Sequence, residues 1–206
     1  MTRPAKSRSK VPKELAVHVK LPRLYVENCE EYSEWLKLEY LHCIASWENI
    51  VFTNVSSAKL HDTLLKKANV YTSSLAGLKE FEPKKTVVLD PAAKKPFRTE
   101  DADRFQAIVV GGILGSEGFT GKTGKLLTGK LGCQARNLGK VQLSIDSAVV
   151  VTKLIALGMK LEDIKLSTEL EILHDDGGST TLPYGYPVLK GKLIFTPGLM
   201  EYLRTH

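Results

Sequence analysis

The stretch Gln106-Ala107-Ile108-Val109-Val110-Gly111-Gly112-Ile113-Leu114-Gly115 decides the fold class. The β-branched run that ends at Val110 predicts a buried strand, and the glycines after it predict a loop at the carboxyl end of that strand. Glycine tolerates positive φ and lets main-chain N–H and C=O groups approach a flat ligand closely. The segment therefore indicates either a ligand site at a strand end or a tight turn without a ligand.

A strand followed by glycines and then by Gly121-Lys122-Thr123 is also typical of a phosphate-binding P-loop. That motif needs a glycine five residues before Gly121, where this chain has Ser116. Glu117 would also put a negative charge among the phosphates. A nucleoside triphosphatase is therefore a disfavoured alternative.

Strand and helix patterns alternate on both sides of this stretch. Ser33 and Ser144 each precede a helical repeat of apolar residues and are predicted N-caps, and Gly158 is the predicted end of the second of these helices. Predicted strands cover 24–26, 49–55, 86–89, 106–110, 170–173 and 193–195, the last before a terminal turn; predicted helices cover 33–47, 61–68 and 144–157, and a short one starts at 99. Such alternation predicts an α/β fold with a mainly parallel sheet between helices, and a ligand at the carboxyl ends of its strands.

The composition is that of an ordinary globular domain. The chain has 206 residues, of which 43% are hydrophobic and 25% charged, and no apolar run is long enough to cross a membrane. Its three cysteines, Cys29, Cys43 and Cys133, lie far apart, which disfavours a disulfide framework and indicates a reducing compartment. The absence of a long apolar run also means that we expect no membrane association. No cluster of His, Cys and carboxylate residues has metal-ligand spacing, so we expect no metal.

The net charge of +6 is concentrated at the amino terminus. Residues 1–23 hold seven of the 29 basic residues and one of the 23 acidic ones, so the remainder is neutral. We interpret residues 1–22 as a basic, flexible arm, because Pro4, Pro12 and Pro22 oppose helix formation. This arm is either a solvated tail, an electrostatic tether to RNA, or, less consistently with its prolines, a mitochondrial presequence.

Three blocks of the sequence together resemble the SPOUT methyltransferase superfamily. The first is Val26–Tyr40 (VENCEEYSEWLKLEY); the second runs from Leu89-Asp90-Pro91 through Glu100-Asp101 and Phe105 to Gly111–Gly115; and the third is Arg136–Val149 (RNLGKVQLSIDSAV). Their order and separation are similar to those of a small archaeal and eukaryotic branch whose eukaryotic activity is protein-arginine methylation. The resemblance covers roughly residues 24–165 and is weaker beyond.

The resemblance implies one domain, residues 23–206, with a trefoil knot in its C-terminal half. It also implies S-adenosylmethionine as the cofactor, held in a bent conformation mostly by main-chain groups, and a monomer rather than a dimer. The cofactor-binding residues implied are Leu89, Asp90, Pro91, Gly111, Gly112, Ile113, Leu114, Gly115, Arg136, Asn137, Leu138, Gly139, Gln142, Leu143, Ser144, Asp146 and Ala148.

Methylation of arginine requires a group that orients the guanidinium and accepts a proton as the new bond forms, and a carboxylate suits both tasks. Glu27, at the end of the first strand, and Glu117, in the expected knot loop, are the candidate catalytic residues. Each also has a plain structural alternative, since Glu27 could bond only to backbone and Glu117 could be solvated. The chain departs from the family pattern on the acceptor side, with Asn28 in place of histidine and Ala92 in place of arginine.

The function predicted from these features is protein-arginine N-methylation of a ribosome-associated protein, by a cytoplasmic enzyme whose arm contacts RNA. The first alternative is methylation of ribosomal or transfer RNA, with the basic arm locating the substrate. The second is a non-catalytic knotted module that binds the cofactor, because the cofactor side of the motif is kept better than the acceptor side.

Overall fold

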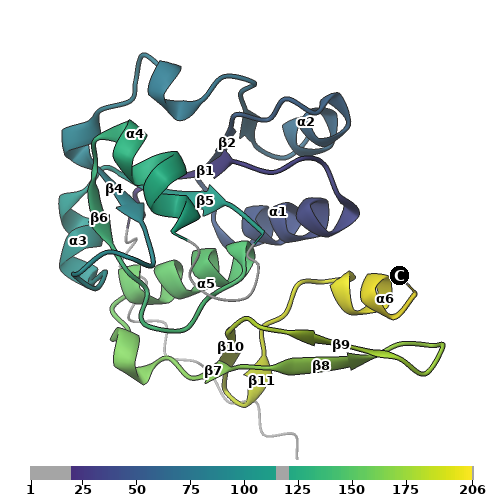
Figure 1. Ribbon diagram of the computed structural model, residues 1–206. Helices are drawn as coiled ribbons and strands as arrows, with labels where there is room; N and C mark the ends of the chain where they lie inside the picture. Colours follow the sequence, from purple (N-terminus) through teal and green to yellow (C-terminus); the bar gives the residue numbers. More distant parts are fainter. Residues whose placement is uncertain (1–19, 115–120, 206) are drawn as a thin grey trace, which may run out of the picture.

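The computed structural model describes residues 20–114 and 121–205, and its centre is a six-stranded parallel sheet (Figure 1). The strand order is β3-β2-β1-β5-β4-β6. The strands are β1 (Arg23–Asn28), β2 (Ile50–Thr53), β3 (Asn69–Val70), β4 (Thr86–Leu89), β5 (Ala107–Gly112) and β6 (Gln134–Arg136). The predicted α/β class with a parallel sheet is confirmed, whereas the trefoil knot and the limits of the domain stay predictions.

The order of the strands places a topological switch point in the middle of the sheet. From β1 the chain continues to β2 and β3 on one side, and β4 and β6 lie on the other side, beyond β5. Strands β1 and β5 pair in register up to Asn28 and Gly112, so their carboxyl ends are adjacent. In open parallel sheets, ligands bind outside the carboxyl ends of the strands at such a point.

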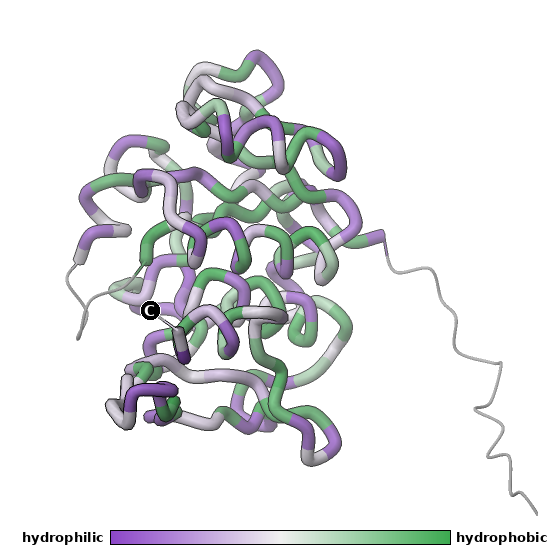
Figure 2. The backbone as a smooth tube through the Cα atoms, turned by 90° about the vertical axis from the view of Figure 1, so that its right-hand side faces the viewer, coloured by the Kyte–Doolittle hydropathy of each residue, from purple (hydrophilic) through white to green (hydrophobic). Residues whose placement is uncertain are grey.

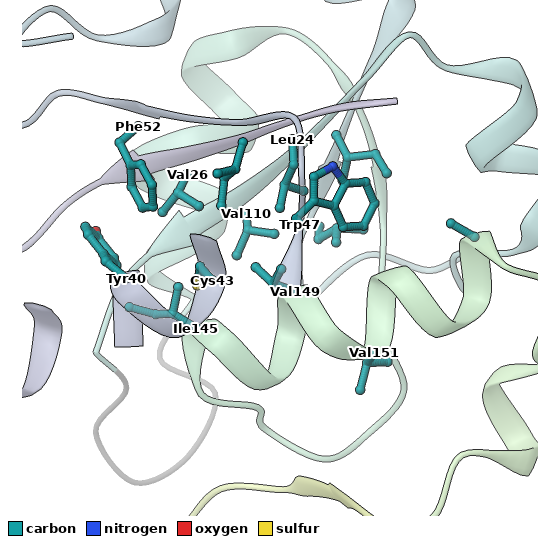
Figure 3. Close-up of a cluster of buried hydrophobic side chains, with 14 of the residues drawn as sticks. Leu24, Val26, Tyr40, Cys43, Trp47, Phe52, Val110, Ile145, Val149 and Val151 are labelled. Atoms are coloured by element: carbon teal, nitrogen blue, oxygen red, sulfur yellow. The ribbon is translucent and has the colours of Figure 1, made fainter. Parts of the chain in front are cut away.

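Helices cover the two faces of the sheet unequally. Helices α1 (Glu34–Ser46), α2 (Ala58–Leu65), α3 (Thr99–Arg104) and α5 (Ile145–Ala156) bury apolar side chains in the larger core cluster, on one face. In Figure 3, Tyr40 and Cys43 of α1 and Ile145 and Val149 of α5 lie against Val110 and its neighbours on the sheet. The other face carries shorter elements, namely the 3-10 turn η2 (Leu75–Gly77), the π-helical turn η4 (Gly124–Thr128) and α4 (Gly129–Leu131). Two further 3-10 turns are η3 (Pro83–Lys85) and η5 (Leu161–Asp163).

The two predicted N-caps are confirmed. The Ser33 hydroxyl accepts a hydrogen bond from the Leu36 amide at 3.1 Å, and the Ser144 hydroxyl accepts one from the Ser147 amide at 3.4 Å. Each bond satisfies one of the free amides in the first turn of a helix, which fixes the starts of α1 and α5. Hydrophobic residues run through the middle of the molecule, where the sheet lies (Figure 2).

The C-terminal part differs from the prediction. It forms a separate layer beside α5 (Figure 1), with a three-stranded sheet β11-β10-β7 and a β8–β9 hairpin, all antiparallel. The strands are β7 (Leu166–Ser167), β8 (Leu170–Leu173), β9 (Ser179–Leu182), β10 (Tyr186–Leu189) and β11 (Lys192–Leu193). The expected terminal turn is wrong: residues Leu199–Thr205 form helix α6, because Leu199 and Leu203 bury one apolar stripe in this layer.

No helix in the described ranges is long and apolar enough to span a membrane. The amino-terminal arm lies almost wholly outside the described residues, as do Gly115 and Glu117.

Candidate active site

A cavity opens at the carboxyl ends of β4 and β5 and extends to the first turn of α5. It encloses about 880 Å³ of space, including its open mouth. Eleven of the predicted cofactor-binding residues line it: Leu89, Asp90, Pro91, Gly111, Ile113, Leu138, Gly139, Gln142, Leu143, Ser144 and Ala148. We call it the first cavity.

Seven other residues complete the wall of the first cavity: Ala92, Val110, Gly121, Lys122, Thr123, Val141 and Ile145. The sequence carries a signal for three of them, since Gly121-Lys122-Thr123 is the segment that imitates a P-loop. One lysine in a mostly apolar lining does not suit a triphosphate, which needs several donors. The lining instead suits a ligand with a large flat apolar part.

Gly112 faces away from the first cavity. A Cβ atom on Gly112 would lie 2.0 Å from the Tyr40 hydroxyl and 3.1 Å from the backbone of Asn28. The tyrosine hydroxyl in turn donates to the Asn28 side chain at 2.7 Å. Gly112 therefore lets the end of β5 pack against α1 and β1. Gly111 has its main chain at the cavity, and a Cβ there would contact Leu127 at 2.8 Å.

Four more of the predicted residues lie outside the lining. The Arg136 guanidinium pairs with Asp101 at 3.0 Å, which joins β6 to α3. The Asn137 side chain donates to the Ala93 carbonyl at 2.8 Å and accepts from the Gly139 amide at 2.9 Å, so it fastens two loops that do line the cavity. Leu114 packs on the larger core, and Asp146 is buried in the first turn of α5.

The Asp90 carboxylate fixes the shape of the first cavity from the end of β4. It accepts hydrogen bonds from the Ala92 amide at 2.9 Å and from the Thr128 hydroxyl at 2.6 Å. The second bond ties the π-helical turn η4 to the sheet. The amide of Gly129 donates to the Gly124 carbonyl, which closes the wide turn characteristic of a π-helix.

Beneath the first cavity, Asp146 and Glu39 form a buried acidic pair at the start of α5. Burial raises the pKa of Asp146, but hydrogen bonds from His42, Ser144 and Thr196 outweigh it, so this pKa lies below its ordinary value. Burial and the charge of Asp146 raise the pKa of Glu39 to about 8. The sequence favours a solvated or cap-supporting role for Glu39, because glutamate is rarely buried. The structure corrects this interpretation, since Glu39 lies on the buried face of α1 with Leu36 and Cys43.

A second cavity lies at the same edge of the sheet, at the carboxyl ends of β1 and β2. It is more polar than the first and carries three glutamates and one lysine. Its lining is Glu27, Asn28, Cys29, Glu30, Glu31, Asn54, Ser56, Ser74, Ala76, Leu126, Lys130 and Leu131. Burial raises the pKa of the Cys29 thiol to about 11, so this group is a neutral thiol at neutral pH rather than a nucleophile.

Glu27 is the predicted catalytic residue that the described structure contains. Its side chain is buried, and it accepts hydrogen bonds from the Thr53 hydroxyl, from the Ser74 hydroxyl at 2.5 Å and from the Leu75 amide at 3.0 Å. These donors hold the carboxylate in one position at the wall of the second cavity. A carboxylate has about four acceptor positions, so one stays open to a further donor.

One segment borders both cavities. Lys122 and Thr123 line the first cavity, whereas Leu126, Lys130 and Leu131, in η4 and α4, line the second. The two cavities therefore flank the β1–β5 switch point on opposite sides of this segment. Within residues 20–114 and 121–205, no group of three or more His, Cys, Asp and Glu side chains could hold a metal ion.

Comparisons with known proteins agree with this arrangement. A family model described as "Protein arginine N-methyltransferase SFM1-like" matches residues 23–206. The chain is 29% identical over 197 residues to protein arginine N-methyltransferase SFM1 of Saccharomyces cerevisiae, covering 87% of this chain and 92% of the yeast protein.

Solved structures of the yeast enzyme are also similar. The complex of yeast SFM1 with S-adenosylmethionine matches with a TM-score of 0.79 at 29% identity, over 89% of this chain and 90% of that one. The dual-specific Trm10 from Thermococcus kodakaraensis matches with a TM-score of 0.53 at 18% identity, over 69% and 96% of the two chains, which shows a shared fold. The chain belongs to the SFM1-like protein arginine N-methyltransferase family, within the SPOUT class of S-adenosylmethionine-dependent methyltransferases.

Proposed function

We propose that this protein transfers a methyl group from S-adenosylmethionine, bound in the first cavity, to an arginine side chain of a protein substrate that enters through the second cavity. The observation that carries this proposal is the pair of cavities on either side of the β1–β5 switch point, one mostly apolar and one acidic. A donor and an acceptor that must meet require two such adjoining sites.

The first cavity fits the cofactor by the chemistry of its walls. When bound, S-adenosylmethionine supplies an activated methyl group on a positively charged sulfur. Leu89, Leu138, Leu143 and Ala148 offer apolar surface for a purine, and the main chain around Gly111 and Gly139 offers polar groups at close approach. Lys122 is the one cationic side chain among the residues that line the cavity. We assign these walls, together with the other predicted residues at the cavity, to cofactor binding.

The second cavity suits a cationic acceptor. A guanidinium keeps its proton in water, because its pKa lies above about 12. We assign to Glu27 the task of accepting a hydrogen bond from this group, which orients the reacting nitrogen and favours loss of its proton as the bond to carbon forms. Glu30 and Glu31 at the same cavity would attract the basic residues around the arginine. Glu117, the other predicted catalytic residue, lies outside the described residues and stays part of the proposal.

The substrate we propose is a ribosome-associated protein, and the enzyme acts as a cytoplasmic monomer. This part is supported by the resemblance to the arginine-methylating branch of the superfamily. The charge distribution of the sequence also supports it, because residues 1–23 hold seven basic residues and one acidic one, a suitable composition for contact with ribosomal RNA near the substrate.

The decisive experiment is transfer of radiolabelled methyl groups from S-adenosylmethionine into a ribosome-containing extract, followed by digestion with RNase or protease. We expect label that survives RNase, is removed by protease and is recovered as methylarginine. Label that is lost with RNase would show an RNA methyltransferase instead. Cofactor binding without any transfer would show a non-catalytic module.

A single substitution tests the proposed role of Glu27. Glu27→Gln should lower kcat by about 10²–10⁴-fold while the dissociation constant for S-adenosylhomocysteine stays within about twofold of the parent value. The exposed Glu48→Gln serves as the matched control and should leave both quantities unchanged. Full activity in Glu27→Gln would remove Glu27 from the catalytic machinery.

A further inference from the structure

Glu39 is a fully buried acidic side chain in the middle of α1, with an exposed fraction of 0%. Its two carboxyl oxygens have different partners. One accepts a hydrogen bond from the indole nitrogen of Trp35 at 2.6 Å, and the other accepts one from the backbone amide of Ile145 at 2.9 Å. The second bond reaches 106 residues along the chain to the first turn of α5, so Glu39 joins two helices that pack on the same face of the sheet.

Asp146 extends this link to the C-terminal layer. One of its oxygens accepts from the Ser144 hydroxyl at 2.6 Å, and the other contacts the His42 ring at 2.6 Å and accepts from the Thr196 hydroxyl at 2.5 Å. Thr196 is itself buried and lies between β11 and α6. Glu39, His42, Asp146 and Thr196, which we call the buried acid unit, therefore connect α1, the start of α5 and the C-terminal layer.

The first turn of α5 is also part of the wall of the first cavity. Ser144, Ile145 and Ala148 line that cavity, and the amide of Ile145 donates to Glu39. A shift of this turn by a fraction of an ångström would change the shape of the cavity, because the closely packed side chains behind it cannot rearrange to compensate. The buried acid unit thus supports the cofactor site from behind without entering it.

When two neighbouring carboxyl groups are buried away from water, ionisation of both costs free energy through lost hydration and mutual repulsion. Asp146 has four hydrogen-bonding partners, namely His42, the Ser144 and Thr196 hydroxyls and the Ser147 amide, and it holds the charge. Glu39 stays protonated at neutral pH, with a pKa of about 8. The other ionisable groups around them are Cys43 and Tyr40 on α1 and Tyr184 and Tyr186 from the C-terminal layer. Burial raises the pKa of each of these four, so all of them stay neutral and none adds a charge beside the two carboxyl groups; His42 contacts Asp146.

We propose that Glu39 is a positioning residue that, in its neutral form, holds the first turn of α5 in place and thereby shapes the wall of the cofactor cavity. This inference rests on the proposed function in one respect, that the cofactor binds in the first cavity. Loss of the proton puts a second negative charge beside Asp146 and drives the two helices apart or draws water between them. The binding-competent form of the cavity is then depleted as Glu39 ionises.

The size of the effect follows from the fraction of molecules that keep Glu39 neutral. One pH unit above a pKa of about 8, about a tenth of the molecules remain protonated, so the apparent dissociation constant rises about tenfold. The probe for this test is methylthioadenosine, because it lacks the α-amino group of the cofactor, which itself titrates near pH 8. Its affinity should fall about tenfold between pH 7 and pH 9.

The test compares the parent protein with Glu39→Gln and with Glu34→Gln, a variant on the same helix whose side chain is partly exposed. Calorimetry at pH 6 to 9.5 should show the tenfold change in the parent protein and in Glu34→Gln, and a change below about twofold in Glu39→Gln. An equal pH dependence in Glu39→Gln, or none in the parent protein, would overturn the inference and leave the proposed function standing. Absence of methylthioadenosine binding at every pH would overturn both.

A second measurement needs no variant. The chain has two tryptophans, and their indole N–H groups provide a probe and an internal control. The Trp35 indole donates to Glu39, whereas the Trp47 indole donates to the Pro22 carbonyl at 3.2 Å. In a nitrogen–proton NMR titration, the Trp35 indole signal should shift with a midpoint near pH 8 and the Trp47 signal should stay constant. A constant Trp35 signal up to pH 9.5 would overturn the inference.

Discussion

The two cavities at the carboxyl edge of the sheet differ in what their walls are made of. The first is formed mainly by aliphatic side chains and glycine main chain from β4, β5 and the turn before α5. The second is formed by glutamates, amides and hydroxyls from the end of β1, from the loops after β1 and β2 and from the residue before η2, with one lysine from α4. Backbone and aliphatic walls recognise a ligand by its shape, whereas a charged wall recognises it by its sign and can be retuned by single substitutions. Of the two departures from the family pattern, Asn28 lines the second cavity, whereas Ala92 lines the first.

The largest effect should come from the two consecutive glycines that end β5. Gly112→Val places its Cβ atom 2.0 Å from the Tyr40 hydroxyl, inside the core. We expect a loss of about 3 kcal/mol of unfolding free energy, measured by urea denaturation. The sequence alone predicts that the valine side chain would enter the cofactor cavity. The structure instead directs it toward Tyr40 and the backbone of β1. Gly111→Ala meets the flexible end of Leu127 at 2.8 Å and should cost only about 1 kcal/mol. Equal costs for the two variants would contradict the packing of Tyr40 against β5.

A second pair of substitutions tests whether the two cavities are separate binding sites, by filling each one in turn with a large side chain. Ala148→Phe fills the first cavity from α5 and should weaken S-adenosylhomocysteine binding by about 100-fold, or about 2.7 kcal/mol, as measured by calorimetry. Ala76→Phe makes the same change at the second cavity and should leave this affinity within about twofold while raising the KM for an arginine peptide. If Ala76→Phe weakens cofactor binding as much as Ala148→Phe does, the division into two sites is wrong.

A third, smaller effect tests the charge of the second cavity. Glu30→Lys combined with Glu31→Lys should raise the KM for a basic arginine peptide by about tenfold, because each exposed charge contributes about 0.2–1 kcal/mol. The effect should shrink as salt is added, since these groups are screened by ions. Reversal of the exposed pair Glu162 and Asp163, in η5, is the control and should leave KM unchanged. An unchanged KM in both charge-reversal variants would show that the acceptor binds elsewhere.

The stability of the folded protein should depend on pH through the buried Glu39. The pKa of Glu39 is raised from 4.5 to about 8 in the folded protein, so folding favours its protonated form. This contribution to stability is complete below about pH 4.5 and is lost as the pH rises through 8. Thermal unfolding of Glu39→Gln should therefore show a flatter decline in Tm between pH 5 and pH 8 than the parent protein. Parallel curves would contradict a neutral Glu39.

Local patterns predict much of the central sheet. Strand β4 has the limits that its sequence predicts, and the caps at Ser33 and Ser144 are visible because a capping bond depends only on neighbouring residues. The C-terminal layer is not predictable in this way, since β7 and β11 have two residues each, too few for a periodic signal. Glu39 escapes prediction for a different reason: its burial depends on α5 and the C-terminal layer, which lie more than 100 residues away in the chain.

The wall of the first cavity is more predictable than that of the second for the same physical reason. Glycines and aliphatic residues at strand ends are visible in the sequence, and eleven of the predicted residues do surround one cavity. By contrast, the hydroxyls of Thr53 and Ser74 that hold Glu27 come from separate segments and show no motif. Asn137 and Arg136 are predicted at the cofactor because they lie in a recognisable block, although their side chains support loops and α3 instead.

The π-helical turn η4 has a mechanical consequence for how the two sites stay aligned. Its wide ring accommodates one residue more than an α-helical turn, and that extra residue rotates everything after it by about 100°. Lys122 and Thr123, before the widened turn, therefore line the first cavity, while Lys130, after it, lines the second. Shortening this turn by a single residue would swing Lys130 out of register. Insertions and deletions here should accordingly be far less tolerated than substitutions.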